Sequence, residues 1–75
     1  MQKINDMKAL GELLRHERKQ QGVTQAQLAA TCGVGIRFIR ELELGKETCH
    51  MGKVLNVIQM LGLNLFAAKR GVNNR

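Results

Sequence analysis

Apolar residues recur at helical spacing in four stretches of the chain, and glycines separate these stretches. The first stretch, residues 6–21, carries one apolar stripe, formed by Met7, Leu10, Leu13 and Leu14. Asn5 or Asp6 is suited to cap its start, and Gly22 follows its end, where glycine adopts a positive φ without strain. The pattern therefore predicts an amphipathic helix over this stretch.

A second, shorter helix is predicted over residues 25–31. Thr24 and Gln27 have the spacing of a capping box at its start. Gly33 follows its end and permits a sharp turn. Val34 is an apolar residue within this tight turn, so we expect it to fill part of the core.

The third predicted helix covers residues 36–44, and Ile39 and Leu42 form its buried face. Gly35 starts this helix as a weaker N-cap than a hydroxyl residue, and Gly45 ends it. A fourth helix is predicted over 51–61 from an apolar face made of Val54, Leu55, Val57, Ile58 and Leu61, with Gly62 at its end.

The apolar residues after Gly62 begin with a period of two, which favours a short strand over residues 63–69. A lone strand has no partner within its own chain, so pairing with a second copy across a two-fold axis is the economical solution. The dimerisation residues would be Leu63, Leu65, Phe66 and Ala67. A fifth helix is the alternative, because part of the segment also fits helical spacing. Residues 70–75 are expected to be frayed.

Composition limits the chain to one small domain spanning residues 1–75, with its core in 6–62. No apolar run is long enough to span a bilayer, and the start has no apolar signal region, so we expect no membrane association and a cytoplasmic, nucleoid-associated protein. The net charge of +6 suggests a polyanionic partner, although many small proteins are basic.

The residue inventory excludes several classes of site. Phe38 and Phe66 are the two aromatic residues, too few for the stacking platforms of single-strand or RNA binders. The possible metal ligands are Cys32, Cys49, His16 and His50. Their spacing does not suit a metal site, so we expect no metal and no cofactor. Serine is absent, aspartate occurs once and no phosphate-binding loop is present, so we expect no enzymatic activity. Cys32 is expected to pack in the core.

Residues 24–46 carry the specific signal. Two short helices joined by a turn at Gly33 are typical of a helix-turn-helix. In that arrangement the second helix protrudes and enters the major groove, which is ~12 Å wide, with its N-terminal residues at the base edges.

This segment carries a resemblance to the Xre or lambdoid-repressor-like helix-turn-helix family, and the resemblance extends over residues 7–62. The matching residues are Thr24-Gln25, Leu28-Ala29, Gly33-Val34, Ile39, Glu43 and Gly45-Lys46. The run from 52 to 65, with Phe38-Ile39 and the residues from Gly45 to Thr48, is similar to the HipB antitoxin branch. The resemblance implies an all-α, lambda-repressor-like domain of four to five helices that dimerises through a small intersubunit sheet. It also implies a structural ion pair between Arg18 and Glu43.

Gly35 departs from the family pattern, which has serine or threonine there. A hydroxyl contact from this position is therefore not carried over.

The candidate DNA-binding residues are Thr24, Gln25, Ile36, Arg37, Arg40, Glu41, Lys46 and Thr48. From the resemblance, Gln25 would bond a backbone phosphate and buttress the third helix; otherwise it is a solvated amide. Arg37 is the best candidate base reader, because bidentate arginine to guanine is the commonest specific contact, and a phosphate clamp is its alternative. Arg40 suits a base or a phosphate equally.

Among the remaining candidates, Glu41 and Lys46 have two interpretations each. Ile36 is able to touch a thymine methyl, and Glu41 either accepts from a cytosine amine or pairs with Arg37 four residues back. Lys46 and Thr48 lie where a loop would pass a phosphate, and Lys46 also suits the helix dipole. Phe38 is expected to pack on the second helix rather than on a base. The tail cations Lys69, Arg70 and Arg75 are expected to be solvated.

These observations predict a two-fold dimer that binds double-stranded operator DNA and represses transcription. The resemblance makes it the antitoxin of a HipBA-like toxin–antitoxin operon, which regulates its own operon and neutralises a kinase-like toxin protein. The alternatives are a phage-type repressor, a restriction-modification controller, or an antitoxin that mainly binds protein, with DNA binding secondary.

Overall fold

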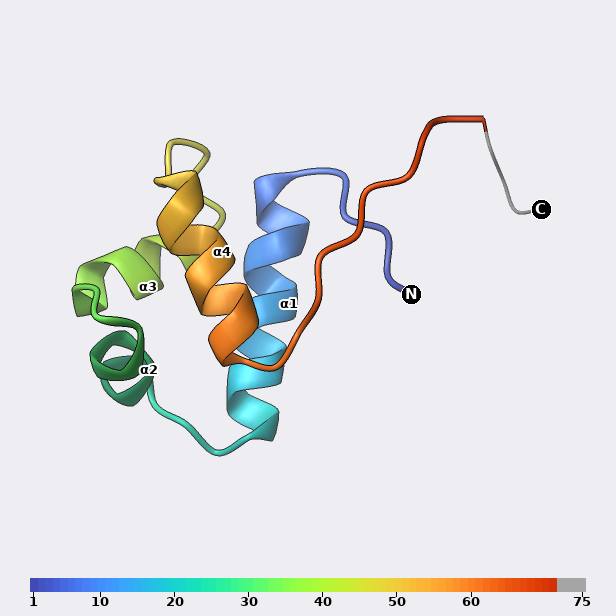
Figure 1. Ribbon diagram of the computed structural model, residues 1–75. Coiled ribbons are helices and arrows are strands. Elements are labelled where there is room, and N and C mark those ends of the chain that lie inside the picture. The colour runs from blue at the N-terminus through green and yellow to red at the C-terminus, as the bar shows by residue number, and fades with distance from the viewer. Residues whose placement is uncertain (72–75) are drawn as a thin grey trace.

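The computed structural model describes residues 1–71, and this part of the chain folds into four α-helices (Figure 1). They are α1 (Met7–Gln20), α2 (Gln25–Cys32), α3 (Ile36–Glu43) and α4 (Met51–Met60). Each lies within one or two residues of the expected stretch, so the all-α prediction is confirmed for these residues. Within the described part, no helix is both long and apolar enough to cross a membrane.

Local hydrogen bonds account for where the helices begin. Asp6 rather than Asn5 caps α1, and its Oδ1 accepts from the backbone N–H of Ala9 at 2.8 Å. Thr24 and Gln27 form the expected capping box on α2, with bonds of 3.0 and 2.8 Å. Gly35 starts α3 without a side-chain cap. His50 caps α4 through Nδ1, which accepts from the backbone N–H of Lys53 at 3.3 Å.

All four helices contribute to one core, in which Leu14, Ile39 and Leu42 are completely buried. Its other members are Leu10, Leu28, Ala29, Cys32, Val54, Val57, Ile58 and Leu61. Leu55 was expected in this core, but it is exposed. Val54 and Ile58 occupy the inner face of α4. Leu55 follows Val54 directly, so its side chain is rotated by about 100° around the helix axis, away from the core.

A buried ion pair joins α1 to the end of α3. Arg18 donates from Nε to Glu43 Oε2 at 2.6 Å and from Nη2 to Oε1 at 3.0 Å, and each residue is only 7% exposed. Arg18 also donates from Nη1 to the carbonyl oxygen of Val23 at 2.9 Å. Burial alone would raise the pKa of Glu43, but hydrogen bonds from Arg18 and Gln25 outweigh it, and this pKa is lowered.

The backbones of α1 and α3 touch beside this ion pair. A Cβ on Gly11 would overlap the carbonyl oxygen of Leu42 and would lie 2.7 Å from that of Glu43. Gly45, with φ of +89°, would place a Cβ 2.8 Å from the Cα of Lys8. Only glycine permits this approach at both positions, so the C-terminal end of α3 is fixed against α1.

The segment after α4 corrects the predicted tail. Residues 63–69 form neither a strand nor a fifth helix in this single chain. Leu63 packs against the core, whereas Leu65 and Phe66 are 53% and 70% exposed. A strand needs a neighbour for its backbone groups, and this chain offers none. Of the frayed tail predicted over 70–75, residues 72–75, with Arg75, lie outside the described residues.

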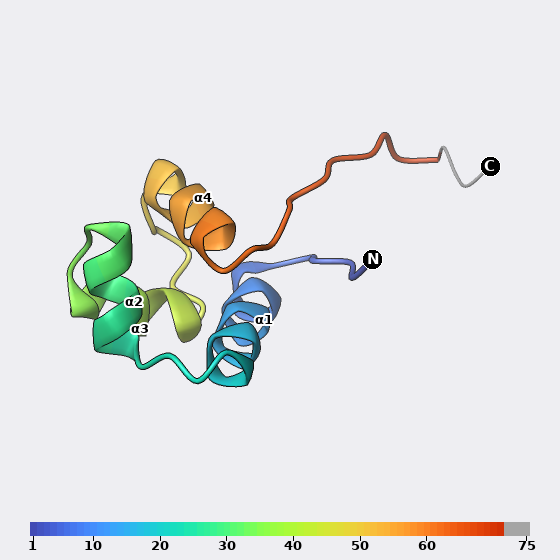
Figure 2. The same ribbon diagram turned by 60° about the horizontal axis from the view of Figure 1, so that its bottom comes forward.

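The tail leaves α4 on one side of the molecule. In both views, it and the N-terminal segment extend beyond α1, away from α2 and α3 (Figures 1 and 2). The helix-turn-helix and the tail therefore lie at opposite ends of the domain.

Replacing Gly11 by alanine tests the contact between α1 and α3. Alanine is the better helix former by about 0.8–1 kcal/mol, yet we expect Gly11→Ala to destabilise the domain by about 1–3 kcal/mol, because the added methyl meets backbone. Urea unfolding measures this. Gly35→Ala is the comparison: its Cβ enters open space at an ordinary φ of −74°, so it should cost only the loss of a glycine N-cap, about 0.5–1 kcal/mol. Unchanged or higher stability of Gly11→Ala would contradict this close contact.

The buried ion pair is tested by changing its members singly and together. Arg18→Met leaves the Glu43 carboxylate buried without its cation and should cost about 3–5 kcal/mol, while adding Glu43→Leu should restore most of this loss. In the wild type, Glu43 contributes to the free energy of unfolding above its unfolded pKa of about 4.3. This contribution is lost as the pH falls through the lower pKa that Glu43 has in the folded protein. The double variant should lose this part of the acid sensitivity, measured as urea midpoints at pH 7 and 3. A double variant as unstable as Arg18→Met would show that the pair is needed as an ion pair.

Candidate nucleic-acid interface

A tight turn sets the direction of α3 relative to α2. Gly33 adopts the left-handed conformation at φ of +70°, and the N–H of Val34 bonds the carbonyl of Ala29 at 3.0 Å. Val34 is half-buried against the core, as expected. Asn56 of α4 donates to the carbonyl of Cys32 at 3.0 Å and so fixes the end of α2. The two short helices thus form a rigid helix-turn-helix.

The two faces of α3 differ sharply. Ile39, Leu42 and Glu43 are buried, whereas Ile36, Arg37 and Arg40 are exposed. The side chain of Arg37 is 85% exposed. The structure therefore presents three of the candidate base-reading residues on one outward-facing, basic helix surface.

Glu41 joins two of the candidate cations. Its Oε2 accepts from Arg37 Nε at 3.1 Å, and its Oε1 accepts from Lys46 Nζ at 3.1 Å. These hydrogen bonds, that of Lys46 first and that of Arg37 second, lower the pKa of Glu41. At neutral pH the carboxylate is therefore charged and bound on both oxygens. Of the two interpretations of Glu41, the structure contains the ion pair with Arg37.

Gln25 and Thr24 occupy the start of α2. Gln25 donates from Nε2 to Glu43 Oε1 at 3.0 Å, so it connects this end of α2 to α3 and to the buried ion pair. Thr24 is exposed, and its hydroxyl oxygen accepts from the Gln27 N–H. Lys46 and Thr48 are exposed in the loop between α3 and α4.

A shallow depression of about 680 Å³ lies between the end of α1 and the starts of α2 and α3. Arg15, Lys19, Gln25 and Ile36 contribute to its lining. Arg15 and Lys19 are not among the residues predicted from the sequence to bind DNA. Their spacing of four residues, off the apolar stripe of α1, is the signal that could have shown a basic edge beside the helix-turn-helix.

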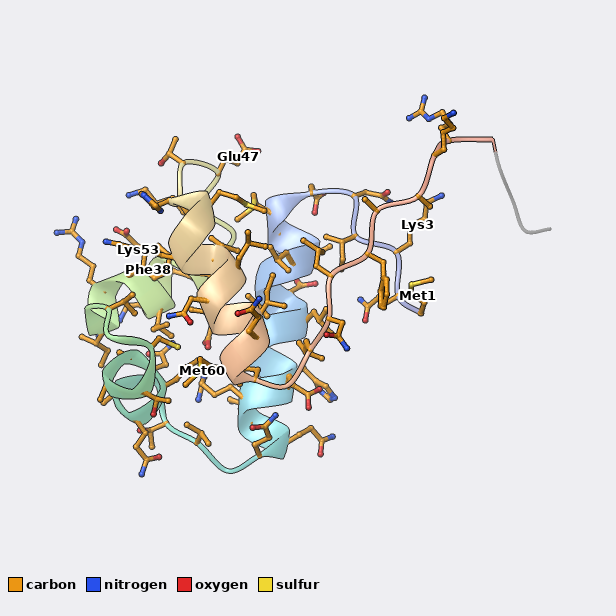
Figure 3. The ribbon with its side chains drawn as sticks, in the orientation of Figure 1. Met1, Lys3, Phe38, Glu47, Lys53 and Met60 are labelled. Atoms are coloured by element: carbon orange, nitrogen blue, oxygen red, sulfur yellow. The ribbon has the colours of Figure 1, made fainter. Side chains whose placement is uncertain are left out.

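Phe38 lies under a cation of α4 rather than on a base-reading surface. Lys53 Nζ is 5.8 Å from the centroid of its ring, and the two side chains lie side by side in Figure 3. Phe38 is half-buried and packs against the core. The expected packing on the second helix therefore missed this contact with α4, which depends on how α3 and α4 are folded together.

The cysteines and histidines form no cluster. Within residues 1–71, no group of three His, Cys, Asp or Glu side chains could hold a metal ion. Cys32 is buried in the core as expected, and burial raises the pKa of its thiol. Cys49 is half-buried, and burial is also the main cause of its raised pKa.

Comparison with known proteins agrees with this geometry. A family model described as "Helix-turn-helix domain" matches residues 9–65. The protein y4mF of Sinorhizobium fredii, described as an uncharacterised HTH-type transcriptional regulator, is 50% identical over 56 residues, which are 75% of this chain and 74% of that protein.

Solved structures containing HipB share the fold. The HipB–O4 20mer complex is 24% identical, with a TM-score of 0.84 over 93% of this chain and 99% of that chain. The HipA–HipB–O2–O3 complex is 24% identical, with a TM-score of 0.85 over the same shares. The HipB–O1–O2 complex is 25% identical, with a TM-score of 0.84 over 92% of this chain and 100% of that chain.

Helix-turn-helix proteins of this kind are DNA-binding regulators rather than enzymes, and no enzymatic activity was expected from the sequence. The resemblance stated from the sequence is confirmed by these matches: the chain belongs to the helix-turn-helix domain family and has the fold of HipB.

Proposed function

We propose that this helix-turn-helix protein reads operator DNA through α3 and represses transcription. One observation carries the proposal: α3 buries one face completely and exposes Ile36, Arg37 and Arg40 on the other. A rigid helix with a basic outer face fits the major groove, which is ~12 Å wide. The net charge of +6 adds attraction to any duplex but does not select a sequence.

The base contacts come from the first half of α3. Arg37 is the principal reader, and its extended, exposed guanidinium suits the O6 and N7 acceptors of guanine. Ile36 packs on a thymine methyl, and Arg40 binds a base or a phosphate one turn later.

Backbone contacts fix the position of α3 in the groove. Thr24 and Gln25 at the start of α2 bind one phosphate, since helix N-termini and short polar side chains commonly hold DNA backbones. Lys46 and Thr48 bind a second phosphate from the loop after α3. Arg15 and Lys19 add positive charge to the depression beside α2.

The functional unit is a homodimer formed through the tail. Leu65 and Phe66 expose apolar side chains on an extended segment, and Leu63 and Ala67 flank them. Pairing with the same segment of a second copy would cover these side chains and satisfy the backbone groups. The tail extends beyond α1, away from α2 and α3, so a tail-to-tail dimer keeps both recognition helices accessible (Figures 1 and 2).

The protein also acts as an antitoxin in this proposal. Its support is the similarity to a chain of the HipA–HipB–O2–O3 complex, in which HipB occurs together with HipA. The corresponding partner here is a kinase-like toxin protein. An adjacent gene for such a protein supports this role, whereas an adjacent nuclease or methylase gene supports a restriction-modification controller.

Selection from a random duplex pool tests the DNA-reading function. We expect an enriched inverted repeat whose half-sites are ~34–36 Å apart, about one helical turn. Arg37→Ala should weaken binding to that site by about 1–3 kcal/mol and relax the preference at one base pair. Labelled DNA provides the readout. Equal weakening on every sequence would restrict Arg37 to a phosphate contact, and no enrichment by the wild type would overturn sequence-specific reading.

Light scattering tests the dimer. Leu65→Asp should give the mass of a monomer, because a carboxylate would have to be buried in the pairing seam. The side chain is half-exposed in the single chain, so this change should leave the fold intact. Leu44→Asp makes the same change at an exposed leucine outside the tail and should remain dimeric. A dimer in both variants would place the interface elsewhere.

A further inference from the structure

Two arginine–glutamate pairs in the described residues 1–71 use different edges of the guanidinium group. Arg18 binds Glu43 side-on, through Nε and Nη2, and is buried by the contact. Arg37 contacts Glu41 through Nε alone, and its side chain remains 85% exposed. A guanidinium has five N–H donors in a planar fork, so the contact to Glu41 leaves the four Nη donors of Arg37 available.

Glu41 is itself held at both ends. While Oε2 accepts from Arg37, Oε1 accepts from Lys46 Nζ at 3.1 Å, beyond the end of α3. The glutamate side chain is 29% exposed, less than either of its cations. Its carboxylate therefore has a defined orientation, and Arg37 is attached to the oxygen that Lys46 does not use.

The geometry points to a positioning role: Glu41, anchored by Lys46, holds Arg37 so that its Nη edge faces the bases, and thereby determines specificity at the base pair that Arg37 reads. This inference rests on the proposed DNA-reading function. The pair of donors on the Nη edge suits the two acceptors of guanine. Because the contact restricts the side chain before DNA arrives, less rotamer freedom is lost on binding.

A direct base contact by Glu41 fits the structure less well. Both carboxylate oxygens already have cationic partners, so a cytosine amine would have to share one of these oxygens with Arg37 or Lys46. Glu41 also lies more than one turn after Ile36, whereas base contacts come mainly from the N-terminal part of a recognition helix.

The positioning role and a simple charge effect predict opposite results. Glu41 is an anion beside the proposed DNA site, so removing it should strengthen binding to any duplex. If Glu41 only repels DNA, cognate and non-cognate affinities rise by the same factor. If it positions Arg37, non-cognate affinity rises while discrimination falls.

The experiment compares Glu41→Ala with Glu47→Ala, an equal change of charge at an exposed residue of the neighbouring loop (Figure 3). The probes are the duplex selected by the wild type, three duplexes altered at the base pair that Arg37→Ala relaxes, and a random duplex, all at one salt concentration. Circular dichroism checks that each variant is folded.

We expect Glu41→Ala to bind the random duplex more tightly, as Glu47→Ala does, but to lose about five- to tenfold in discrimination at that base pair. Glu47→Ala should keep the wild-type discrimination. The double variant Arg37→Ala/Glu41→Ala should discriminate no worse than Arg37→Ala alone, because the two residues act through one contact.

Two results with the variants would overturn the inference. Unchanged discrimination in Glu41→Ala would reduce Glu41 to its charge. Lost preference at a different base pair, additive with Arg37→Ala, would make Glu41 a base reader itself. Failure of the wild type to enrich any sequence would overturn the proposed function, and this inference with it, before the variants are compared.

Discussion

The backbone of α1 lies in direct contact with the C-terminal end of α3, and this contact sets how the helices pack against one another. Gly11 and Gly45 lack side chains where the two helices meet, so the carbonyl groups of Leu42 and Glu43 lie directly against α1. This approach brings Glu43 within reach of Arg18, and the ion pair then closes over the junction. A side chain at either glycine would separate the helices and with them the ion pair.

The ion pair extends this constraint to the helix-turn-helix, the side of the domain proposed to face DNA. Arg18 bonds the Val23 carbonyl in the loop before α2, and Gln25 of α2 donates to Glu43 Oε1, which also accepts from Arg18 Nη2. One carboxylate thus connects α1, α2 and α3. Since a buried ion pair often contributes little net stability, its value here lies in fixing the relative positions of the helices. The ion pair therefore fixes the position of the proposed phosphate contact at α2 relative to the proposed base contacts of α3.

Local signals in the sequence were sufficient for the helices and their ends. Asp6, Thr24 and the glycines act within one turn of their own position, so the spacing of residues reports them directly. The Arg18–Glu43 pair spans 25 residues and was available only through resemblance to a family. Leu55 and Phe38 were placed less well, because their environment depends on how α4 packs against the other helices.

The conformation of the tail could not be predicted from the sequence, for a different reason. Its alternating apolar residues indicate an extended segment, but strand formation requires a neighbour that one chain does not contain. Of the candidate DNA-binding residues, by contrast, Ile36, Arg37 and Arg40 are exposed on α3, where helical periodicity alone places them, whereas Gln25 and Glu41 are half-buried. The connection of Glu41 to both Arg37 and Lys46 needed side-chain coordinates.

The two ends of α3 are held very differently. Its C-terminal end is fixed by the contact with α1, whereas its first turn begins at Gly35 with no side-chain cap. The amide groups of Ile36 and Arg37 therefore depend on solvent, and local opening of the helix requires least energy there. α3 is thus anchored at its C-terminal end, whereas its first turn is held by the fewest local bonds. In the proposed complex with DNA, small differences in groove width between binding sites would be accommodated within that single turn of backbone.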